Sequence, residues 1–184
     1  MSQPTSNLPL FRHHPDPIRS GSVIGSAVTC RCCGTARGFI YAGPVYAEDE
    51  LEDALCPWCI ADGSAHEKFD ATFVDSEAFA DDTPEAAVTA ITERTPGFSA
   101  WQSERWPSCC GEPAAFLTPA GIEDVRQQYP HLEGDLMMFI VHELDISGGA
   151  ARRTLEALRR DQSPTAFVFK CLHCDGFPVY VDSL

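Results

Sequence analysis

Four cysteines in two short pairs are the residues whose types and spacing point most directly to chemistry. Cys30-x-x-Cys33 and Cys56-x-x-Cys59 each place two thiols on one turn. Zinc takes four soft ligands in a tetrahedron, with each sulfur about 2.3 Å from the metal, and two such turns supply all four. The spacing therefore predicts a structural zinc site at Cys30, Cys33, Cys56 and Cys59. Cys32 is left over, as a free thiol or one that lies against the ligands.

A second zinc site is predicted from the cysteines of the C-terminal half. Cys171-x-x-Cys174 supplies one pair, and the adjacent Cys109 and Cys110 are candidates for the other two ligands. Cys110 is the better of the doublet because Gly111 follows it, and adjacent residues rarely point at one ion without distortion. Three histidines could substitute: His131, His142 and His173. A set of only three ligands would leave an open position for water, as in a catalytic zinc site, and a buried thiol pair is the remaining alternative.

Other chemistries fit the residues less well. Cys56-Pro57-Trp58-Cys59 opens a predicted helix, as a thioredoxin-like redox pair does, but no strand–helix–strand alternation surrounds it and a matching pair lies upstream. The chain has no Ser nucleophile elbow, phosphate-binding Gly loop or His-Glu-x-x-His motif. Treble-clef nucleases contain histidine, but residues 38–46 have none, and His66 is expected to have an ordinary surface or capping role.

The charge balance restricts the class of partner. The 184 residues contain 13 Lys and Arg against 27 Asp and Glu, a formal net charge of −14. Each four-cysteine zinc site adds about −2, since four thiolates outweigh one dication. Such a surface repels nucleic-acid phosphates and attracts basic proteins. One basic group is predicted on a helix, where a solvated face with arginines near the C-terminal dipole is the simpler explanation: Arg152, Arg153, Arg159 and Arg160.

The cysteine count and the hydropathy indicate the compartment. The nine cysteines are an odd number, so they cannot all form disulfides. Met1 to Pro9 has no apolar run typical of a signal peptide, and no stretch reaches the roughly 18 apolar residues of a membrane span. We therefore expect a cytoplasmic protein with reduced thiols and no membrane partner.

The pattern of elements predicts an α+β fold held by these two sites. Residues 1–29, with Pro4 and three further prolines, are expected to form an extended arm, on which His13 and His14 lie at the surface. Residues 30–74 are expected to form a treble-clef-like zinc unit. Residues 107–184 are expected to form a zinc-ribbon-like lobe with a helical insert at about 121–161. Residues 75–106 form an acidic linker, a helix and an aromatic segment. Alternatively, the whole chain forms one compact domain.

The treble-clef prediction rests on the order of three elements. A knuckle at Cys30–Gly34 precedes a hairpin, in which 38–41 and 45–46 flank Ala42-Gly43-Pro44. A helix then runs from Cys56 to about Phe69, with Pro57 in its first turn.

Helices and strands are expected in the rest of the chain as well. Thr83 should cap a helix over 84–94. The aromatic segment of Phe98, Trp101 and Trp106 is expected to pack in a core rather than line a ligand groove. Helical patterns cover 122–128, 134–144 and 150–160, a β-like run covers 115–117, and runs at 165–169 and 177–181 flank the Cys171 turn as a ribbon hairpin.

Motifs along almost the whole chain resemble the CbrC family. They are Leu8-Pro9-x-Phe11, His14-Pro15-Asp16-Pro17, Arg37-Gly38-x-Ile40-Tyr41-x-Gly43-Pro44-x-Tyr46, Leu55-Cys56-Pro57-Trp58-Cys59-Ile60-Ala61-Asp62-Gly63-Ser64-Ala65, Phe69-Asp70, Arg94-Thr95-Pro96-Gly97-Phe98-x-x-Trp101-Gln102, Trp106, Cys110-Gly111, Ala114-Ala115-Phe116, Ser163-Pro164-Thr165-Ala166 and Cys171-x-x-Cys174. The resemblance implies a bacterial, cytoplasmic, zinc-binding protein. It also implies an association with colicin tolerance and a role in toxin immunity. Some members carry His where this chain has Cys109, which favours that position as a ligand.

These observations lead to one functional hypothesis and two alternatives. The first is a zinc-binding, non-catalytic protein that neutralises a basic toxin, which its acidic surface would attract. The second is a metal-dependent hydrolase or nuclease that uses an incomplete second zinc site. The third is a nucleic-acid-binding zinc ribbon, which the net charge disfavours.

Overall fold

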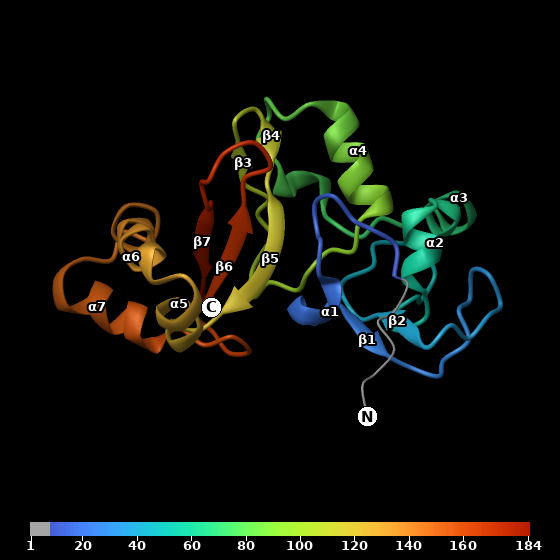
Figure 1. Cartoon of the computed structure of the whole chain (residues 1–184), viewed down its shortest axis with the longest axis horizontal. Coiled ribbons are helices and arrows are strands. Elements are labelled where there is room, and N and C mark those ends of the chain that lie inside the picture. The colour runs from blue at the N-terminus through green and yellow to red at the C-terminus, as the bar shows by residue number, and fades with distance from the viewer. Residues whose placement is uncertain (1–7) are drawn as a thin grey trace. The chain divides into compact units, whose positions relative to one another are not determined.

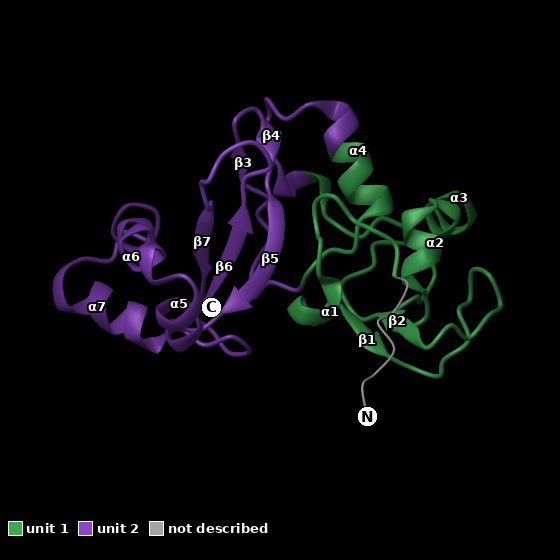
Figure 2. Ribbon diagram, viewed as in Figure 1, with its two compact units in different colours: residues 1–76, 88–98 green, residues 77–87, 99–184 purple. Residues whose placement is uncertain are grey.

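A computed structural model gives the fold of residues 8–184, which is α+β (Figure 1). Residues 1–7, including Pro4 of the expected arm, lie outside the described residues. The chain divides into two compact units (Figure 2). One takes the chain up to Ser76 together with Val88–Phe98, and the other takes Glu77–Ala87 with Ser99–Leu184. Segments 30–74 and 107–184 therefore belong to the first and second unit, and segment 75–106 is divided between them.

The sheet of the first unit pairs strands that are not neighbours along the chain. Strand β1 (Val23–Gly25) lies antiparallel to β2 (Phe39–Tyr41), with Val23 opposite Tyr41. The predicted hairpin between residues 38–41 and 45–46 does not form, so this prediction was wrong. The Tyr41 hydroxyl donates to the Pro44 carbonyl at 2.9 Å and closes the turn, while Tyr46 forms a bridge with Thr72 instead. The expected arm thus supplies β1, and helix α1 (Pro17–Ser20) precedes it.

The helix expected over 56–69 is two helices. Helix α2 (Pro57–Ala61) begins at the predicted proline, and α3 (Ser64–Phe69) follows after a break. Gly63 has φ +83°, a left-handed conformation that ends α2. Asp62 Oδ1 then accepts hydrogen bonds from the Ser64 amide at 2.9 Å and the Ser64 hydroxyl at 2.6 Å, which starts α3.

One close backbone approach fastens the end of the first unit to its core. A β-carbon added to Gly97 would lie 1.9 Å from the Phe73 carbonyl oxygen, so only glycine fits there. The buried Tyr41 hydroxyl accepts the Gly97 amide proton at 3.1 Å, and the Tyr41 ring packs edge-on against Phe73 with centroids 5.5 Å apart. Tyr41 therefore connects β2 to two segments far along the chain.

Helix α4 (Glu85–Arg94) is shared between the two units and matches the predicted helix closely. The expected cap does not form: Thr83 Oγ1 is buried and has no hydrogen-bond partner among the described residues. A short 3-10 turn, η1 (Ser76–Ala78), precedes this helix.

The second unit is built on a three-stranded antiparallel sheet in the order β5-β6-β7. The strands are β5 (Ala115–Ala120), β6 (Thr165–Lys170) and β7 (Val179–Asp182). Between β5 and β6 run α5 (Ile122–Gln128), the 3-10 turn η2 (Pro130–Leu132), α6 (Glu133–His142) and α7 (Gly148–Ala157). The helical insert predicted near 121–161 is confirmed, and Figure 1 shows its helices together on one side of the sheet.

The two faces of this sheet carry different side chains because residues alternate along each strand. Ala166 and Val168 of β6 pack into the apolar cluster formed by the helices. Phe167 and Phe169 point the other way, and Trp106 packs edge-on against Phe169 with centroids 5.8 Å apart. Trp106 is 2% exposed, as expected of a core residue.

The three aromatic residues expected to form one segment lie in different environments. Phe98 is buried in the first unit. Trp101 belongs to the second unit, is 37% exposed and donates from its ring nitrogen to Thr165 Oγ1 at 2.9 Å. Within residues 8–184, no helix combines the length and the apolar character needed to cross a membrane.

Candidate metal centres

The structure gathers Cys30, Cys33, Cys56 and Cys59 into one group, the first cluster, whose sulfurs all lie within 4.8 Å of one another. Three Sγ–Sγ distances are 3.9 Å (Cys30–Cys59), 4.0 Å (Cys33–Cys56) and 3.6 Å (Cys56–Cys59). A tetrahedral zinc with bonds of about 2.3 Å would separate its sulfurs by about 3.8 Å. These three separations of the first cluster are those expected around a zinc ion.

Local backbone structure positions each pair of the first cluster. The knuckle is closed by the Gly34 amide, which donates to the Cys30 carbonyl at 2.8 Å, and Gly34 has φ +68°. Cys56 is the N-cap of α2, and Cys59 lies one turn further along this helix. The Cys56 amide also donates to Cys30 Sγ at 3.3 Å, which joins the two pairs directly.

The first cluster is largely buried, and this affects how its thiols ionise. Burial raises the pKa of Cys56 to about 11, and burial also raises the pKa of Cys59. Burial opposes ionisation of Cys33 too, but hydrogen bonds from the Thr35 backbone and neighbouring thiols lower its pKa to about 7. Several thiolates so close together need a cation, and a bound dication would supply that charge.

Basic side chains surround the knuckle of this otherwise acidic chain. Lys68 Nζ donates to the carbonyls of Arg31 at 3.1 Å and Cys32 at 3.0 Å. The Arg37 guanidinium lies 5.3 Å from the ring centroid of Trp58, which directly precedes Cys59 in α2. These cations would offset part of the negative charge of a four-thiolate site.

The second cluster consists of Cys109, Cys110, Cys171 and Cys174, whose sulfurs also lie within 4.8 Å of one another. Cys109 Sγ is 3.7 Å from Cys174 Sγ and 3.9 Å from Cys110 Sγ. Both members of the doublet therefore belong to the group, although adjacent residues were expected to conflict.

A tight turn explains how the two adjacent cysteines point to one place. Strands β3 (Ser108–Cys109) and β4 (Glu112–Pro113) form a hairpin with a two-residue loop. Cys110 has φ +55° and Gly111 has φ +80°, the positive values that a type I′ turn requires at both central positions. The left-handed backbone at Cys110 rotates its side chain toward that of Cys109. The sequence did not predict that both adjacent cysteines would join one cluster, because a cysteine with a left-handed backbone conformation is rare.

Backbone amides also point at the sulfurs of the other pair. The His173 amide donates to Cys171 Sγ at 3.4 Å, and the Gly176 amide donates to Cys174 Sγ at 3.3 Å. The bond from His173 is the main cause that lowers the pKa of Cys171 to about 6, whereas the neighbouring thiols of Cys171 and Cys174 raise the pKa of Cys109 to about 12. This pattern of amide donors around a C-x-x-C turn is suited to thiolate sulfurs.

Among residues 8–184, both clusters contain cysteine alone, so the histidine alternatives do not join them. His173 Nε2 is 2.5 Å from Glu112 Oε2, which ties the Cys171 turn to the β3–β4 hairpin. His131 packs against the Phe177 ring with centroids 5.2 Å apart, and His142 ends α6. Cys32 lies outside both groups, with its thiol 3.5 Å from Ser64 Oγ.

His14 is a buried polar residue that sequence reasoning placed wrongly. His13 and His14 were expected at the surface, but they are 5% and 0% exposed. His14 Nδ1 is 2.6 Å from the Pro96 carbonyl and must donate to it, so Nε2 accepts from the Ser20 hydroxyl at 2.7 Å. Because Pro96 is 82 residues away, no local pattern could have revealed this contact.

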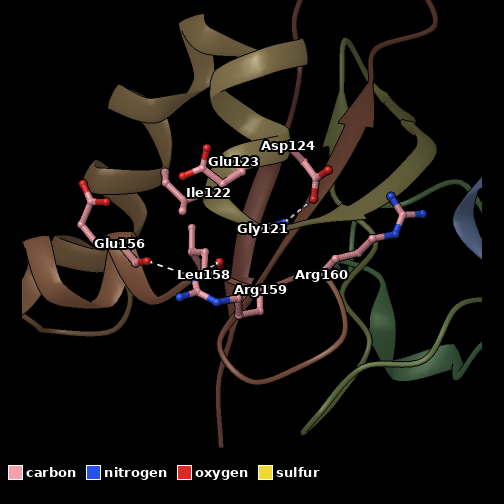
Figure 3. Close-up of a pocket in the computed structure, with 8 residues that line it drawn as sticks. All are labelled: Gly121, Ile122, Glu123, Asp124, Glu156, Leu158, Arg159 and Arg160. Atoms are coloured by element: carbon pink, nitrogen blue, oxygen red, sulfur yellow. Dashed lines mark hydrogen bonds between the residues drawn. The ribbon is translucent and has the colours of Figure 1, made fainter.

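The four arginines expected on one helix do not all lie on it: Arg152 and Arg153 are in α7, which ends at Ala157, and Arg159 and Arg160 follow it. Arg159 Nη1 donates to the carbonyls of Glu156 and Leu158, at 3.1 and 2.8 Å, and so closes the end of the helix. Arg159 and Arg160 line a hollow of about 240 Å³ that also contains three carboxylates (Figure 3): those of Glu123, Asp124 and Glu156. The mixed charges make this hollow a poor site for an anion.

Comparison with known proteins gives a consistent result. The family model described as "Uncharacterised protein family (UPF0167)" matches residues 8–183. A UPF0167 protein of Mycobacterium bovis is 43% identical over 176 residues, which is 95% of this chain and 93% of that protein. A UPF0167 protein of Pseudomonas aeruginosa is 43% identical over 171 residues, which is 91% of this chain and 92% of that protein. No solved structure matches the chain.

Proposed function

The chain belongs to the UPF0167 family, and we propose that it is a zinc-stabilised, non-catalytic binding protein for a basic protein partner. The observation that carries this proposal is the presence of four cysteine sulfurs in each cluster. A tetrahedral zinc with four protein ligands has no position left for water or substrate, so it holds structure rather than performing chemistry.

The arrangement of the clusters supports two zinc-binding folds within this proposal. Cys30–Gly34 with the α2 helix start resembles two parts of a treble clef, although β2 pairs with β1 where a hairpin would be expected. The β3–β4 turn and the loop between β6 and β7 resemble the two knuckles of a zinc ribbon. Reduced thiols are required at both, so a cytoplasmic location is part of the proposal.

Four sulfurs at the second cluster also count against the hydrolase alternative. That mechanism needs an incomplete site in which water binds the metal. With Cys109 and Cys110 both turned toward Cys174, such a site would have to lose a cysteine ligand first. The carboxylates beside Arg159 and Arg160 similarly weaken the nucleic-acid alternative.

Acidic segments on the surface support a basic partner. In the loop 48–53 the carboxylate residues are exposed, whereas Leu51 is 1% exposed and anchors the loop in the core of the first unit. A fixed array of negative charge raises the association rate of a positively charged partner about 10- to 1,000-fold at low salt. The resemblance to the CbrC family, with its association with colicin tolerance, suggests that this partner is a toxin. Many nuclease toxins are basic.

Binding kinetics with purified, basic colicin-type nuclease domains would test the proposal. We expect the zinc-loaded chain to bind such a domain with an association rate that falls steeply as salt is raised from low to high concentration. The variant Glu48→Gln/Glu50→Gln/Glu52→Gln should slow association. A matched control removes three exposed charges from the second unit and should have a smaller effect: Glu123→Gln/Asp135→Asn/Glu143→Gln. Failure to form any salt-sensitive complex across a panel of such domains would refute the proposal.

A further inference from the structure

The two clusters differ in how far solvent can reach their sulfurs. In the first cluster three cysteines are buried and only Cys33 is exposed. In the second cluster only Cys171 is buried, while Cys110 and Cys174 are exposed. The two sulfur–sulfur contacts of Cys109, with Cys110 and with Cys174, are both at the solvent-exposed surface. A small reagent can therefore reach the second cluster without unfolding the chain.

Two glycines leave the second cluster without side-chain cover. Gly176 lies against the sulfurs: a β-carbon there would be 3.2 Å from Cys174 Sγ and 3.7 Å from Cys109 Sγ. A β-carbon on Gly111, at the tip of the β3–β4 turn, would meet no atom within 4 Å. At these two positions backbone alone lies beside the exposed sulfurs, where larger side chains would have shielded them.

We propose that the second cluster is a site of thiol oxidation by hydrogen peroxide, at which Cys109 and Cys174 form a disulfide. This inference rests on the zinc-binding role proposed above. The Cys109–Cys174 pair is chosen because its sulfurs are only 3.7 Å apart and belong to two different hairpins, β3–β4 and β6–β7. A disulfide between the adjacent Cys109 and Cys110 would instead close a strained ring across one peptide bond.

The oxidation can be written as two balanced steps. The Cys174 thiolate attacks one peroxide oxygen, the O–O bond breaks, a sulfenic acid forms and hydroxide leaves. The Cys109 thiolate then attacks the sulfenic sulfur, the S–S bond forms and a second hydroxide leaves. Two thiolates have lost two electrons, and peroxide has become two hydroxides, which buffer acid protonates to water. Cys110 and Cys171 are then the two ligands left, too few to complete a four-sulfur site, so the metal is released.

The first cluster should survive the same treatment. Cys30 and Cys56 are each 0% exposed, and Cys59 is 2% exposed, so peroxide meets only Cys33 at the surface. Release of the first metal would require local opening of α2 and the knuckle, which is slower than direct attack on an exposed sulfur.

Zinc release from the full chain tests this inference. Zinc content is measured first, and two zinc ions per chain are expected. Hydrogen peroxide is then added with a zinc-sensitive dye, and one ion should be released at least tenfold faster than the other. Trypsin digestion should yield peptide 106–126 linked to peptide 171–184, each containing two cysteines of the second cluster. Fragmentation of this product should place the bond at Cys109 and Cys174.

Variants and outcomes separate the two proposals. Cys32→Ser should leave release unchanged, whereas Cys109→Ser should abolish the linked peptides; if Cys109→Ser does not fold, the wild-type digest decides. Fewer than two zinc ions per chain before oxidation would overturn the zinc-binding role itself, and with it this inference. Two ions that leave at equal rates, or peptides linked only through the first cluster, would overturn the inference and leave the zinc-binding role standing.

Discussion

Substitution of the buried His14 by asparagine should remove a large pH dependence from the stability of the protein. Burial is the main cause that lowers the pKa of His14 from 6.5 to about 4, against opposing effects of the Pro96 carbonyl bond and the Asp16 charge. Above pH 6.5 the imidazole is neutral in the folded and unfolded chain, and folding is not penalised. As the pH falls, the unfolded chain takes up the proton first, so stability is lost between pH 6.5 and about 4.

The size of this stability loss follows from the pKa of His14 in the unfolded chain, 6.5, and in the folded chain, about 4. Each tenfold change in proton affinity is worth about 1.4 kcal/mol, so the free energy of unfolding should fall by about 3 kcal/mol over this pH range. The partners of the ring do not prevent this. Nδ1 already donates to the Pro96 carbonyl in the neutral ring, so protonation adds no bond there. A proton on Nε2 would oblige the Ser20 hydroxyl to turn from Nε2 and donate to the Pro17 carbonyl instead.

Urea unfolding of the zinc-saturated wild type and His14→Asn at pH 4 to 7 would measure the effect. Asparagine can still donate to the Pro96 carbonyl but does not titrate. Both proteins keep the same cysteines, so acid loss of zinc cancels in their difference. Wild type should be the more stable at pH 7, and its advantage should shrink by about 3 kcal/mol as the pH approaches 4. Ser20→Ala keeps the buried ring and should retain the wild-type slope. A wild-type advantage that stays constant with pH would refute the reasoning.

Three further predictions concern other parts of the chain. Gly97→Ala should lower the free energy of unfolding by at least about 2 kcal/mol in a urea titration, because the new β-carbon would overlap the Phe73 carbonyl. The control Gly134→Ala lies in open space on α6, so it should be neutral or stabilising by up to about 1 kcal/mol. Cys56→Ser should remove one zinc per chain and lower the thermal midpoint, whereas Cys32→Ser should change neither zinc content nor midpoint; equal losses would contradict the ligand assignment. Arg126→Met should speed hydrogen exchange in α5 and α7, because Arg126 pairs with Glu133 and Glu156; unchanged exchange would show that this exposed network contributes nothing.

Elements defined by local pattern could be predicted from the sequence, and α5 is an example. The predicted helix over 122–128 coincides with Ile122–Gln128, since its apolar residues repeat with helical spacing and Asp124 accepts the Gly121 amide at its start. Three of the cysteine pairs also follow from local spacing, because each C-x-x-C turn contributes two thiols as a unit: Cys30 with Cys33, Cys56 with Cys59, and Cys171 with Cys174.

Features that depend on distant residues could not be predicted. Nothing near Phe39–Tyr41 indicates that its partner is Val23–Gly25, and the local Gly-Pro turn suggested a hairpin instead. The presence of both Cys109 and Cys110 in the second cluster depends on a positive φ at Cys110, which the paired strands of the β3–β4 hairpin impose. In each case the deciding contact is set by the fold and not by the neighbouring sequence.

The proposed metal sites and the proposed partner are linked through charge. The formal net charge of −14 counts every cysteine as neutral, and two four-thiolate zinc sites, at −2 each, would take it to about −18. Loading with zinc should therefore strengthen the attraction to a basic partner as well as stabilise the fold. Oxidation of the second cluster would reverse part of this change, because the disulfide carries no charge and the four-thiolate site is lost. A partner held by electrostatic steering should then associate more slowly with the oxidised chain than with the reduced one, and the difference should disappear at high salt.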